Sequence, residues 1–186
     1  TMQMFYGRRG DGRAFHAELI RGGGLGATAG RDGEGSFIFP ANGANTPVEI
    51  LESDSPLVVE RRELLPDSGG PGKQRGALGR REVFRVPEGA GAPQAPVMLA
   101  IQSGRFRLPP EGLIGGQPGA HAQFLVNGKP GDPYGLTELQ PGDTVVMDAA
   151  GGGGYGEPRE RDRESLARDL REGKVTQERA QRDYGS

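Results

Sequence analysis

The sequence predicts a mainly β fold: an irregular β-sandwich or barrel-like domain with Gly-rich loops and a short C-terminal helical hairpin. Gly supplies 34 of the 186 residues and Pro 15, and these residues separate short apolar runs, which is typical of a loop-rich β protein. At least seven of the runs have the length of a strand. Helical spacing is found only near the C-terminus. We therefore expect a β-rich domain over residues 1–156 and a helical tail packing on it over residues 157–186.

Charge and composition exclude several classes of partner. Lys and Arg number 23 and Asp and Glu 25, for a net charge of −2, so we expect no nucleic-acid or anionic membrane surface. Arg61-Arg62 and Arg80-Arg81 are the local exceptions. Adjacent side chains of a strand point to opposite faces, so neither pair is expected to form a basic patch. Disulfide and thiolate chemistry are excluded, because the chain has no Cys.

The sequence also bears on location. No apolar run approaches the roughly 18 residues that a membrane-spanning helix needs. The segment Thr1–Tyr6 has neither a basic region nor a long apolar stretch, so we expect no signal peptide. The sequence therefore predicts a cytoplasmic protein.

Strands are predicted in the first half of the chain from short apolar runs. Residues 1–47 are weakly patterned, but Phe15–Ile20 and Ser36–Phe39, the latter closed by Pro40, have strand character. Val48–Glu52 alternates as a strand does, and Pro56–Leu65 is the longest strand candidate. Its middle, Arg61-Arg62-Glu63, breaks the alternation, which predicts a bulge or partial exposure.

The second half adds strands with clear turn signals. Four further strands are predicted, at residues 81–86, 97–102, 122–126 and 144–148. Asn127-Gly128 follows an apolar run and predicts a tight hairpin, because a type I′ turn needs positive φ at both central residues. Pro141-Gly142-Asp143 predicts another turn, since Pro fixes φ and Gly tolerates the left-handed region.

The tail contains helix-start and helix-stop signals. Asp162 can cap a helix that runs to about Glu172, with Gly173 in the position that ends it. Leu166 and Leu170 give this helix a narrow apolar stripe, which must pack against another element. A second short helix is predicted from a Thr176 cap to about Asp183.

Two Gly-rich motifs invite a phosphate-binding interpretation. Gly151–Gly156 matches G-x-G-x-x-G after a predicted strand, but the βαβ unit required for dinucleotide binding has no place downstream. The Asp67–Gly79 loop has Gly-rich and basic character, yet it departs from the phosphate-loop pattern at Asp67 and at Gln74. Its alternatives are a structural loop and an anion nest made of backbone N–H groups. The residues of such an anion site are Asp67, Ser68, Gly69, Gly70, Gly72, Lys73 and Arg75.

The sequence contains no recognisable catalytic constellation. His16 and His121 are isolated, without a second ligand at metal-binding spacing. No Ser lies in a G-x-S-x-G nucleophile elbow. We therefore predict no catalytic residue and no metal site within this chain.

A motif string in the centre resembles the C-terminal portion of the B-type subunit in the hydantoinase B/oxoprolinase family. It comprises Asn45–Glu52, Pro56–Glu60 and Asp67–Gly79. Further landmarks resemble the family in the same order: Gly22–Ala27, Pro109–Gly116, Pro141–Asp143 and Gly151–Gly156. Two positions depart from the pattern: Ala77, where the family usually has Gly, and Glu111, where an aromatic residue is common.

The resemblance implies a role within an assembly. Members of the family are longer, work with an A-type subunit that uses ATP, and open cyclic amides such as hydantoins and 5-oxoproline. Related carboxylases act on ketones. The resemblance thus implies, as partners, the N-terminal half of a B-type subunit and an A-type subunit, with ATP and a divalent metal in the full assembly and none bound by this chain.

The same resemblance limits what this chain can do by itself. The family's Asn-Asp-Pro-Tyr and Gly-Gly-Thr-His type motifs do not occur in the sequence, so no catalytic residue is carried over. A scaffold and subunit-interface domain, inactive by itself, is the leading interpretation. A stand-alone module that binds small anions and a part of a ketone carboxylase are the alternatives.

Overall fold

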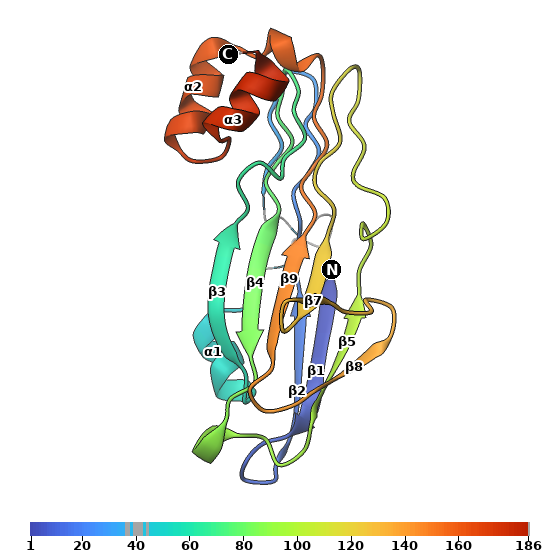
Figure 1. Ribbon diagram of the computed structural model, residues 1–186, viewed down its shortest axis with the longest axis vertical. Helices are drawn as coiled ribbons and strands as arrows, with labels where there is room; N and C mark the ends of the chain where they lie inside the picture. Colours follow the sequence, from blue (N-terminus) through green and yellow to red (C-terminus); the bar gives the residue numbers. More distant parts are fainter. Residues whose placement is uncertain (36–37, 39–42, 44, 186) are drawn as a thin grey trace.

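Two antiparallel β-sheets pack face to face in the computed structural model, which describes residues 1–35, 38, 43 and 45–185 (Figure 1). The first sheet has the strand order β2-β1-β5-β8 and the second the order β3-β4-β9-β6-β7. The first comprises β1 (Met2–Arg8), β2 (Ala14–Ile20), β5 (Val97–Gln102) and β8 (Leu136–Leu139). The second comprises β3 (Val58–Leu64), β4 (Arg80–Arg85), β6 (Gln123–Val126), β7 (Lys129–Pro130) and β9 (Thr144–Ala149). This mainly β sandwich confirms the predicted fold class.

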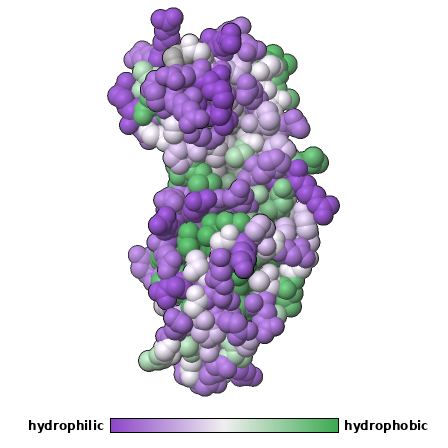
Figure 2. All heavy atoms as spheres, in the orientation of Figure 1, coloured by the Kyte–Doolittle hydropathy of each residue, from purple (hydrophilic) through white to green (hydrophobic). Residues whose placement is uncertain are grey.

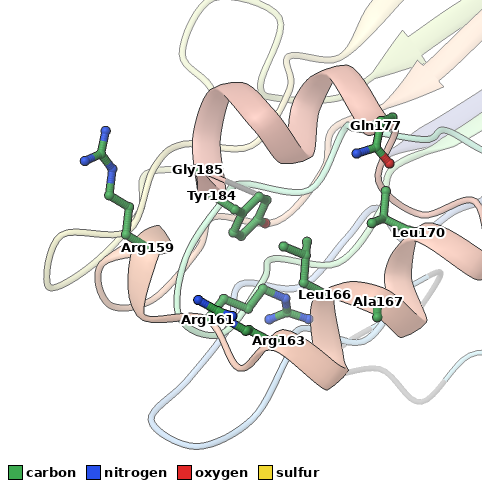
Figure 3. Close-up of a pocket in the computed structure, with 9 residues that line it drawn as sticks. All are labelled: Arg159, Arg161, Arg163, Leu166, Ala167, Leu170, Gln177, Tyr184 and Gly185. Atoms are coloured by element: carbon green, nitrogen blue, oxygen red, sulfur yellow. The ribbon is translucent and has the colours of Figure 1, made fainter.

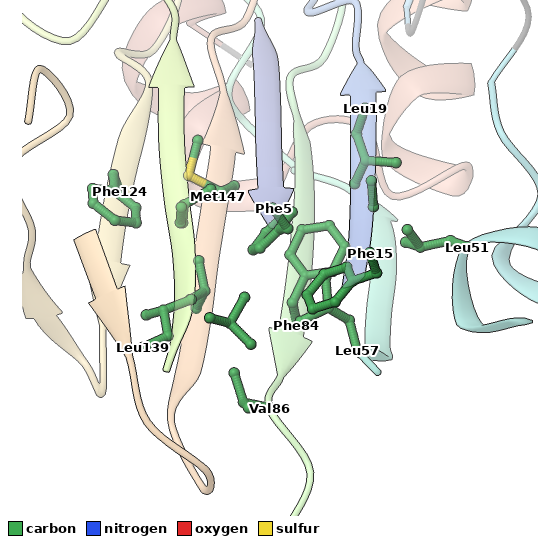
Figure 4. Packing of buried hydrophobic residues seen from close by; sticks show 14 residues of the cluster. Phe5, Phe15, Leu19, Leu51, Leu57, Phe84, Val86, Phe124, Leu139 and Met147 are labelled. Atoms are coloured by element: carbon green, nitrogen blue, oxygen red, sulfur yellow. The ribbon is translucent and has the colours of Figure 1, made fainter. Parts of the chain in front are cut away.

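Alternate residues of the strands build the apolar core between the sheets. Along β2, Phe15, Ala17 and Leu19 are buried while the residues between them are exposed. The rings of Phe5 in β1 and Phe84 in β4 lie 5.3 Å apart between centroids, and this contact joins the two sheets (Figure 4). Because both rings are almost wholly buried, truncating either to Ala would cost about 3–5 kcal/mol.

Most of the predicted strands and turns are confirmed. The strands predicted near residues 15–20, 81–86, 97–102, 122–126 and 144–148 end within one residue of β2, β4, β5, β6 and β9. The longest candidate contains β3, and its pairing with β4 shifts register between Val59 and Arg61, as the broken alternation predicted. Asn127 and Gly128 have φ values of 51° and 75°, as the hairpin between β6 and β7 requires.

One predicted strand is wrong. Val48–Asp54 forms the helix α1, which begins after Pro47. Val48, Leu51 and Ser55 are its less exposed positions, and their spacing of three and four residues places them on one helical face. A five-residue alternation is compatible with both periods, so packing of Leu51 against the sandwich core decides the outcome. The strand predicted over Ser36–Phe39 falls largely on residues outside the described part of the chain.

Three strands were not predicted. The inward positions of β1 include Gln3 and Phe5, so a polar residue interrupts the apolar alternation that reveals a strand. The strands β7 and β8 have two and four residues, too few for a periodic signal. A 3-10 turn, Gly89–Gly91, also lies between β4 and β5.

Above the sandwich, four Gly-rich segments run side by side toward the helical end of the molecule (Figure 1). We call residues 22–35, 66–79, 109–120 and 150–156 the glycine bundle. Beyond it lie four helical elements: η2 (Pro158–Glu160), α2 (Arg163–Arg171), α3 (Gln177–Arg179) and the π-helical turn η3 (Ala180–Tyr184). No helix in the described ranges is long and apolar enough to cross a membrane.

The helical tail begins and ends as the sequence predicted. The Asp162 carboxylate accepts a hydrogen bond from the Ser165 N–H at the start of α2, and Gly173, with φ of 67°, follows its end. Thr176 caps α3 by accepting from the Arg179 N–H. The apolar side chains of the tail form a small second core made of Leu166, Val175, Ala180 and Tyr184, with Leu170 packed against it.

Candidate functional site

The segment Gly151–Gly154 forms hydrogen bonds with all three other segments of the glycine bundle. Its partners lie far apart in the sequence. The bonds are Ala27 N–H to Gly153 O, Gly70 N–H to Gly152 O, Gly152 N–H to Ala77 O and Leu113 N–H to Gly154 O, at 2.8–2.9 Å. Backbone polar groups that the fold buries here are thus satisfied by other backbone groups.

Close approach of backbones explains why this segment is all glycine. A Cβ atom at Gly151 would lie closer than 3.0 Å to the Ser68 carbonyl, and one at Gly152 would meet the Leu25 carbonyl in the same way. No side chain fits between backbones at that spacing. The match to G-x-G-x-x-G therefore has a packing cause in this fold.

The first residues of the predicted anion loop fasten the loop to its surroundings. The Asp67 carboxylate accepts from both the N–H and the hydroxyl of Thr176, each at 2.8 Å. The Ser68 hydroxyl donates to Leu65 O at 2.6 Å and accepts from the Gly79 N–H at 2.7 Å. Asp67 therefore holds the start of the second tail helix, and Ser68 closes the base of the loop.

The glycines and the two cations of the loop are also engaged. Gly69, Gly70 and Gly72 face neighbouring backbones at distances that leave no room for a Cβ atom. Lys73 Nζ lies 3.2 Å from a carboxylate oxygen of Glu160, with both side chains half exposed. The Arg75 side chain is buried, and its Nε donates to Asp169 at 3.1 Å. The structure thus brings all seven residues into one loop, and the anion-nest interpretation stays a prediction.

Four charged side chains join the glycine bundle to the tail, and we call Asp32, Arg75, Arg161 and Asp169 the tail network. Arg161 donates to both carboxylate oxygens of Asp32, at 2.9 and 2.8 Å. It also donates to Asp169 at 2.6 Å, where Arg75 donates as well. Arg75, Arg161 and Asp169 are each less than a tenth exposed, so this is a buried network in which two cations meet two anions.

Burial and the neighbouring charges shift the pKa values of Asp32 and Arg161 in opposite directions. Burial alone would raise the pKa of Asp32, but the hydrogen bonds and charge of Arg161, with the Arg75 N–H, hold that pKa below its usual value. Burial would lower the pKa of Arg161, yet Asp32 and Asp169 raise it overall. Nearby, burial raises the pKa of Tyr184 to about 12. Asp32 and Arg161 are therefore both ionised at neutral pH.

Sequence reasoning did not single out Asp32, Arg161 or Asp169. The Arg161–Asp32 contact spans 129 residues, so no local pattern could reveal it. One signal was present in α2: Asp169 lies three residues after Leu166 and one before Leu170, on the stripe that packs inward. A charged residue on a buried stripe needs a partner of opposite charge.

An open groove of about 870 Å³ lies between η2, α2 and the last helical turns (Figure 3). Leu166, Leu170 and Tyr184 provide its apolar surface, and Arg159 and Arg163 provide basic groups on its rim. Figure 2 shows that hydrophilic side chains dominate the outer surface of this helical end. The two histidines lie elsewhere and are exposed. Within the described residues, no three His, Cys, Asp or Glu side chains come together as metal ligands would.

Comparison with known proteins places the chain in one family. The model of the hydantoinase B/oxoprolinase family matches residues 1–158. The B-type component of a putative D-/L-hydantoinase from Pseudomonas sp. (strain NS671) is 31% identical over 177 residues, covering 89% of this chain and 28% of that protein.

Solved structures show the same fold. An ATP-dependent caprolactamase from Pseudomonas jessenii matches with a TM-score of 0.79 and 23% identity, over 99% of this chain and 33% of its own. A nucleotide-free acetone carboxylase matches with a TM-score of 0.77 and 20% identity, over 99% of this chain and 29% of its own. The chain thus spans about a quarter to a third of the length of these relatives. As the motif string predicted, it belongs to the hydantoinase B/oxoprolinase family.

Proposed function

We propose that this chain is the C-terminal domain of a B-type subunit in an ATP-dependent cyclic-amide hydrolase of the hydantoin or 5-oxoproline type. In that assembly it is a scaffold and a subunit interface, and it has no activity by itself. The observation that carries the proposal is that, in this family member, the buried charged side chains of the tail network pair with one another and leave no group there free to act on a substrate. The best-placed charged groups, those of the tail network, bind one another.

An exposed apolar loop supports the interface role. Leu108, Leu113 and Ile114 are 71%, 59% and 74% exposed, although apolar side chains of this size favour burial. Ile114 has a φ of 53°, which costs energy in a β-branched residue and marks a position that the surrounding fold imposes. The Leu113 N–H is held by Gly154 O. The loop therefore presents apolar side chains on a fixed support, as partner surfaces do.

The remaining chemistry belongs, in this proposal, to the partners. The caprolactamase and the acetone carboxylase that share this fold are both described as ATP-dependent. We assign ATP and a divalent metal to the N-terminal half of the B-type subunit and to the A-type subunit. A cytoplasmic location belongs to the same proposal, since a chain without Cys gains nothing from an oxidising compartment.

The proposal is tested by reconstitution. The purified chain is mixed with the N-terminal half of a B-type subunit and with an A-type subunit, and association is followed by size-exclusion chromatography. ATP-dependent opening of hydantoin and 5-oxoproline is then assayed. We expect no turnover by the chain alone and turnover by the mixture. Turnover by the chain alone, or no association with either partner, would rule the proposal out.

A loop variant makes the test specific to the interface. Ile114→Asn removes an exposed apolar side chain and places a residue that tolerates positive φ at this position, so the chain should fold and associate at least tenfold more weakly. Ile50→Asn is the matched control, because Ile50 is 50% exposed on α1. Equal weakening by both variants would show that the 108–114 loop is not the interface.

A ketone carboxylase is the second candidate function. The chain resembles acetone carboxylase in fold nearly as closely as it resembles caprolactamase, with TM-scores of 0.77 and 0.79. The first resemblance favours a carboxylase and the second a hydrolase. The reconstituted mixture separates the two when it is given acetone or acetophenone with bicarbonate and ATP. Carboxylation without cyclic-amide opening would support the carboxylase and contradict the hydrolase.

A further inference from the structure

Three arginines surround one glutamate inside the sandwich, at the end next to the glycine bundle. Arg80 and Glu82 lie two residues apart on β4 and therefore face the same side. Arg62 is paired with Glu82 across β3 and β4, and Arg21 follows the last residue of β2 in the opposite sheet. We call Arg21, Arg62 and Arg80 the arginine cluster. Because neighbouring side chains of a strand point to opposite faces, one member of each Arg-Arg pair turns inward, and these two members, Arg62 and Arg80, meet at Glu82.

The cluster has more positive charge than its surroundings balance. The Nε atoms of Arg21 and Arg62 lie 3.2 and 2.9 Å from the Glu82 carboxylate, and that of Arg80 lies 3.9 Å from it. One carboxylate therefore faces three guanidinium groups. The segment 36–44, most of which the structure does not describe, has no Asp or Glu in its sequence. Two positive charges thus remain without a counter-charge from the described residues or from this segment.

Hydrogen bonding is incomplete in the same place. Arg62 Nη1 donates to Thr46 O and Arg80 Nη1 donates to Asn45 Oδ1. Both Nη atoms of Arg21, with Nη2 of Arg62 and Nη2 of Arg80, are buried without an acceptor among the described residues. The Nε atoms of Arg21 and Arg62 lie at ion-pair distance from Glu82, but neither they nor Glu82 Oε1 make an aligned hydrogen bond. Arg21 is only 2% exposed and Arg80 5%. A buried charged donor without an acceptor is strongly destabilising, so these groups point to a missing acceptor.

Loss of a proton does not remove this excess charge. Burial lowers the pKa of Arg21 to about 10; Glu82 opposes the shift, and the neighbouring Arg62 and Arg80 add to it. Burial lowers the pKa of Arg80 as well, with the same opposition from Glu82. At neutral pH both guanidiniums remain protonated, so an anion has to balance them.

We propose that the arginine cluster binds a small free oxyanion, of the phosphate or carboxylate type. Guanidinium groups present paired N–H donors that match the oxygens of these anions. The occupant has to be small, because the chain's own atoms already enclose Arg21 and Arg80. Arg62, with 21% of its side chain exposed, marks the side from which an ion enters.

The test uses the full chain in chloride buffer without other oxyanions. Phosphate and, separately, acetate are titrated by isothermal calorimetry, and unfolding is followed by calorimetry at matched ionic strength. We expect saturable binding of one stoichiometric ion. At a concentration one hundred times its Kd, the ion should raise Tm by about 5–10 °C. Phosphate and acetate distinguish a tetrahedral from a planar occupant. No saturable binding of either ion would overturn the proposal.

Two substitutions with opposite expected effects locate the ion. Arg21→Met removes an unbalanced charge, so the variant should lose the Tm response to the ion. Glu82→Gln removes the negative charge that Glu82 supplies to the site, so its folding should depend on the ion more strongly than that of the wild type. If Glu82→Gln does not fold at any ion concentration, the milder Arg62→Gln replaces it, with an expected Kd at least tenfold weaker.

Arg13→Met is the control, because Arg13 is exposed and its loss changes the net charge equally. An unchanged ion response in Arg21→Met, or an equal loss in Arg13→Met, would contradict the assignment. The site does not depend on the proposed assembly, so a failed reconstitution leaves this test intact.

Discussion

Arg161 Nη2 donates to Asp169 Oδ2 across 2.6 Å, and the same oxygen accepts from Arg75 Nε at 3.1 Å. A single buried carboxylate thus joins a guanidinium of the tail to a guanidinium of the glycine bundle. Neither the bundle, which has few side chains, nor the tail, which has a small apolar core, offers a large apolar surface for packing. The ionic contact, together with the Asp67–Thr176 hydrogen bonds, therefore fixes how the two parts fit together.

Replacing Asp169 with Asn should be strongly destabilising. Both arginines would remain buried with one carboxylate fewer, and breaking such a contact from one side costs about 3–5 kcal/mol. For a chain of this size that loss corresponds to a fall in Tm of roughly 6–20 °C, measured by calorimetry. Glu172→Gln is the control on an exposed carboxylate just after α2, and it should leave Tm nearly unchanged. Comparable losses in the two variants would show that Asp169 does not join the two parts.

Replacing Gly152 with Ala should disrupt the glycine bundle. The added methyl group would meet the Leu25 carbonyl, which is backbone and cannot rotate away. Overpacking costs typically 1–3 kcal/mol and more where backbones must separate, so we expect a loss of about 3 kcal/mol in the free energy of unfolding by urea. Gly104→Ala is the matched control, because a Cβ there meets nothing within 4 Å. A Gly152→Ala variant as stable as Gly104→Ala would contradict the close packing.

The Asp32–Arg161 contact should make stability depend on acid pH. The folded-state pKa of Asp32 is lowered, so its contribution is present above the unfolded pKa, about 3.9, and is lost as pH falls through the lower folded value. Asp32→Asn should therefore be less stable than the wild type at pH 7, and the difference should shrink below about pH 4. Urea unfolding at several pH values measures it. A difference that stays constant down to pH 2 would show that Asp32 ionisation is not involved.

Tyr184 should lose its proton late. Burial raises its pKa to about 12, against the lowering effect of the nearby Arg161 and Arg75. The absorbance difference between wild type and Tyr184→Phe at 295 nm should therefore rise near pH 12 and remain flat through the ordinary range near pH 10. The raised pKa also means that this group's contribution to stability is lost only as pH rises from about 10 toward 12. A titration midpoint near pH 10 in the folded protein would show that the Tyr184 phenol is exposed to water and would contradict its burial.

Several elements were predictable because their causes lie within a few residues. The turn at Asn127-Gly128 requires positive φ at two adjacent positions, and the caps at Asp162 and Thr176 bond the N–H three residues later. The apolar run Val97–Ile101 identified β5 to the residue. The family motif string could be recognised for the same reason, since it is a local order of residues. The α1 helix could not, because five alternating residues fit two periods and a tertiary contact of Leu51 selects one.

The sequence by itself determined the mainly β class, the turns, the capped tail and the family, while it left a sandwich and a barrel open. Only the tertiary structure decided which charges meet. Asp32 and Arg161 are 129 positions apart, and the arginine cluster draws on β3, β4 and the end of β2. Strand register and sheet packing fix the arginine cluster, and the fit of the tail on the glycine bundle fixes the Asp32–Arg161 contact, whereas caps and turns depend on neighbours along the chain. The alternation of side chains along a strand predicted that neither Arg61-Arg62 nor Arg80-Arg81 forms a patch by itself. Pairing of β3 with β4 brings Arg62 and Arg80 to one carboxylate, and face-to-face packing of the sheets adds Arg21.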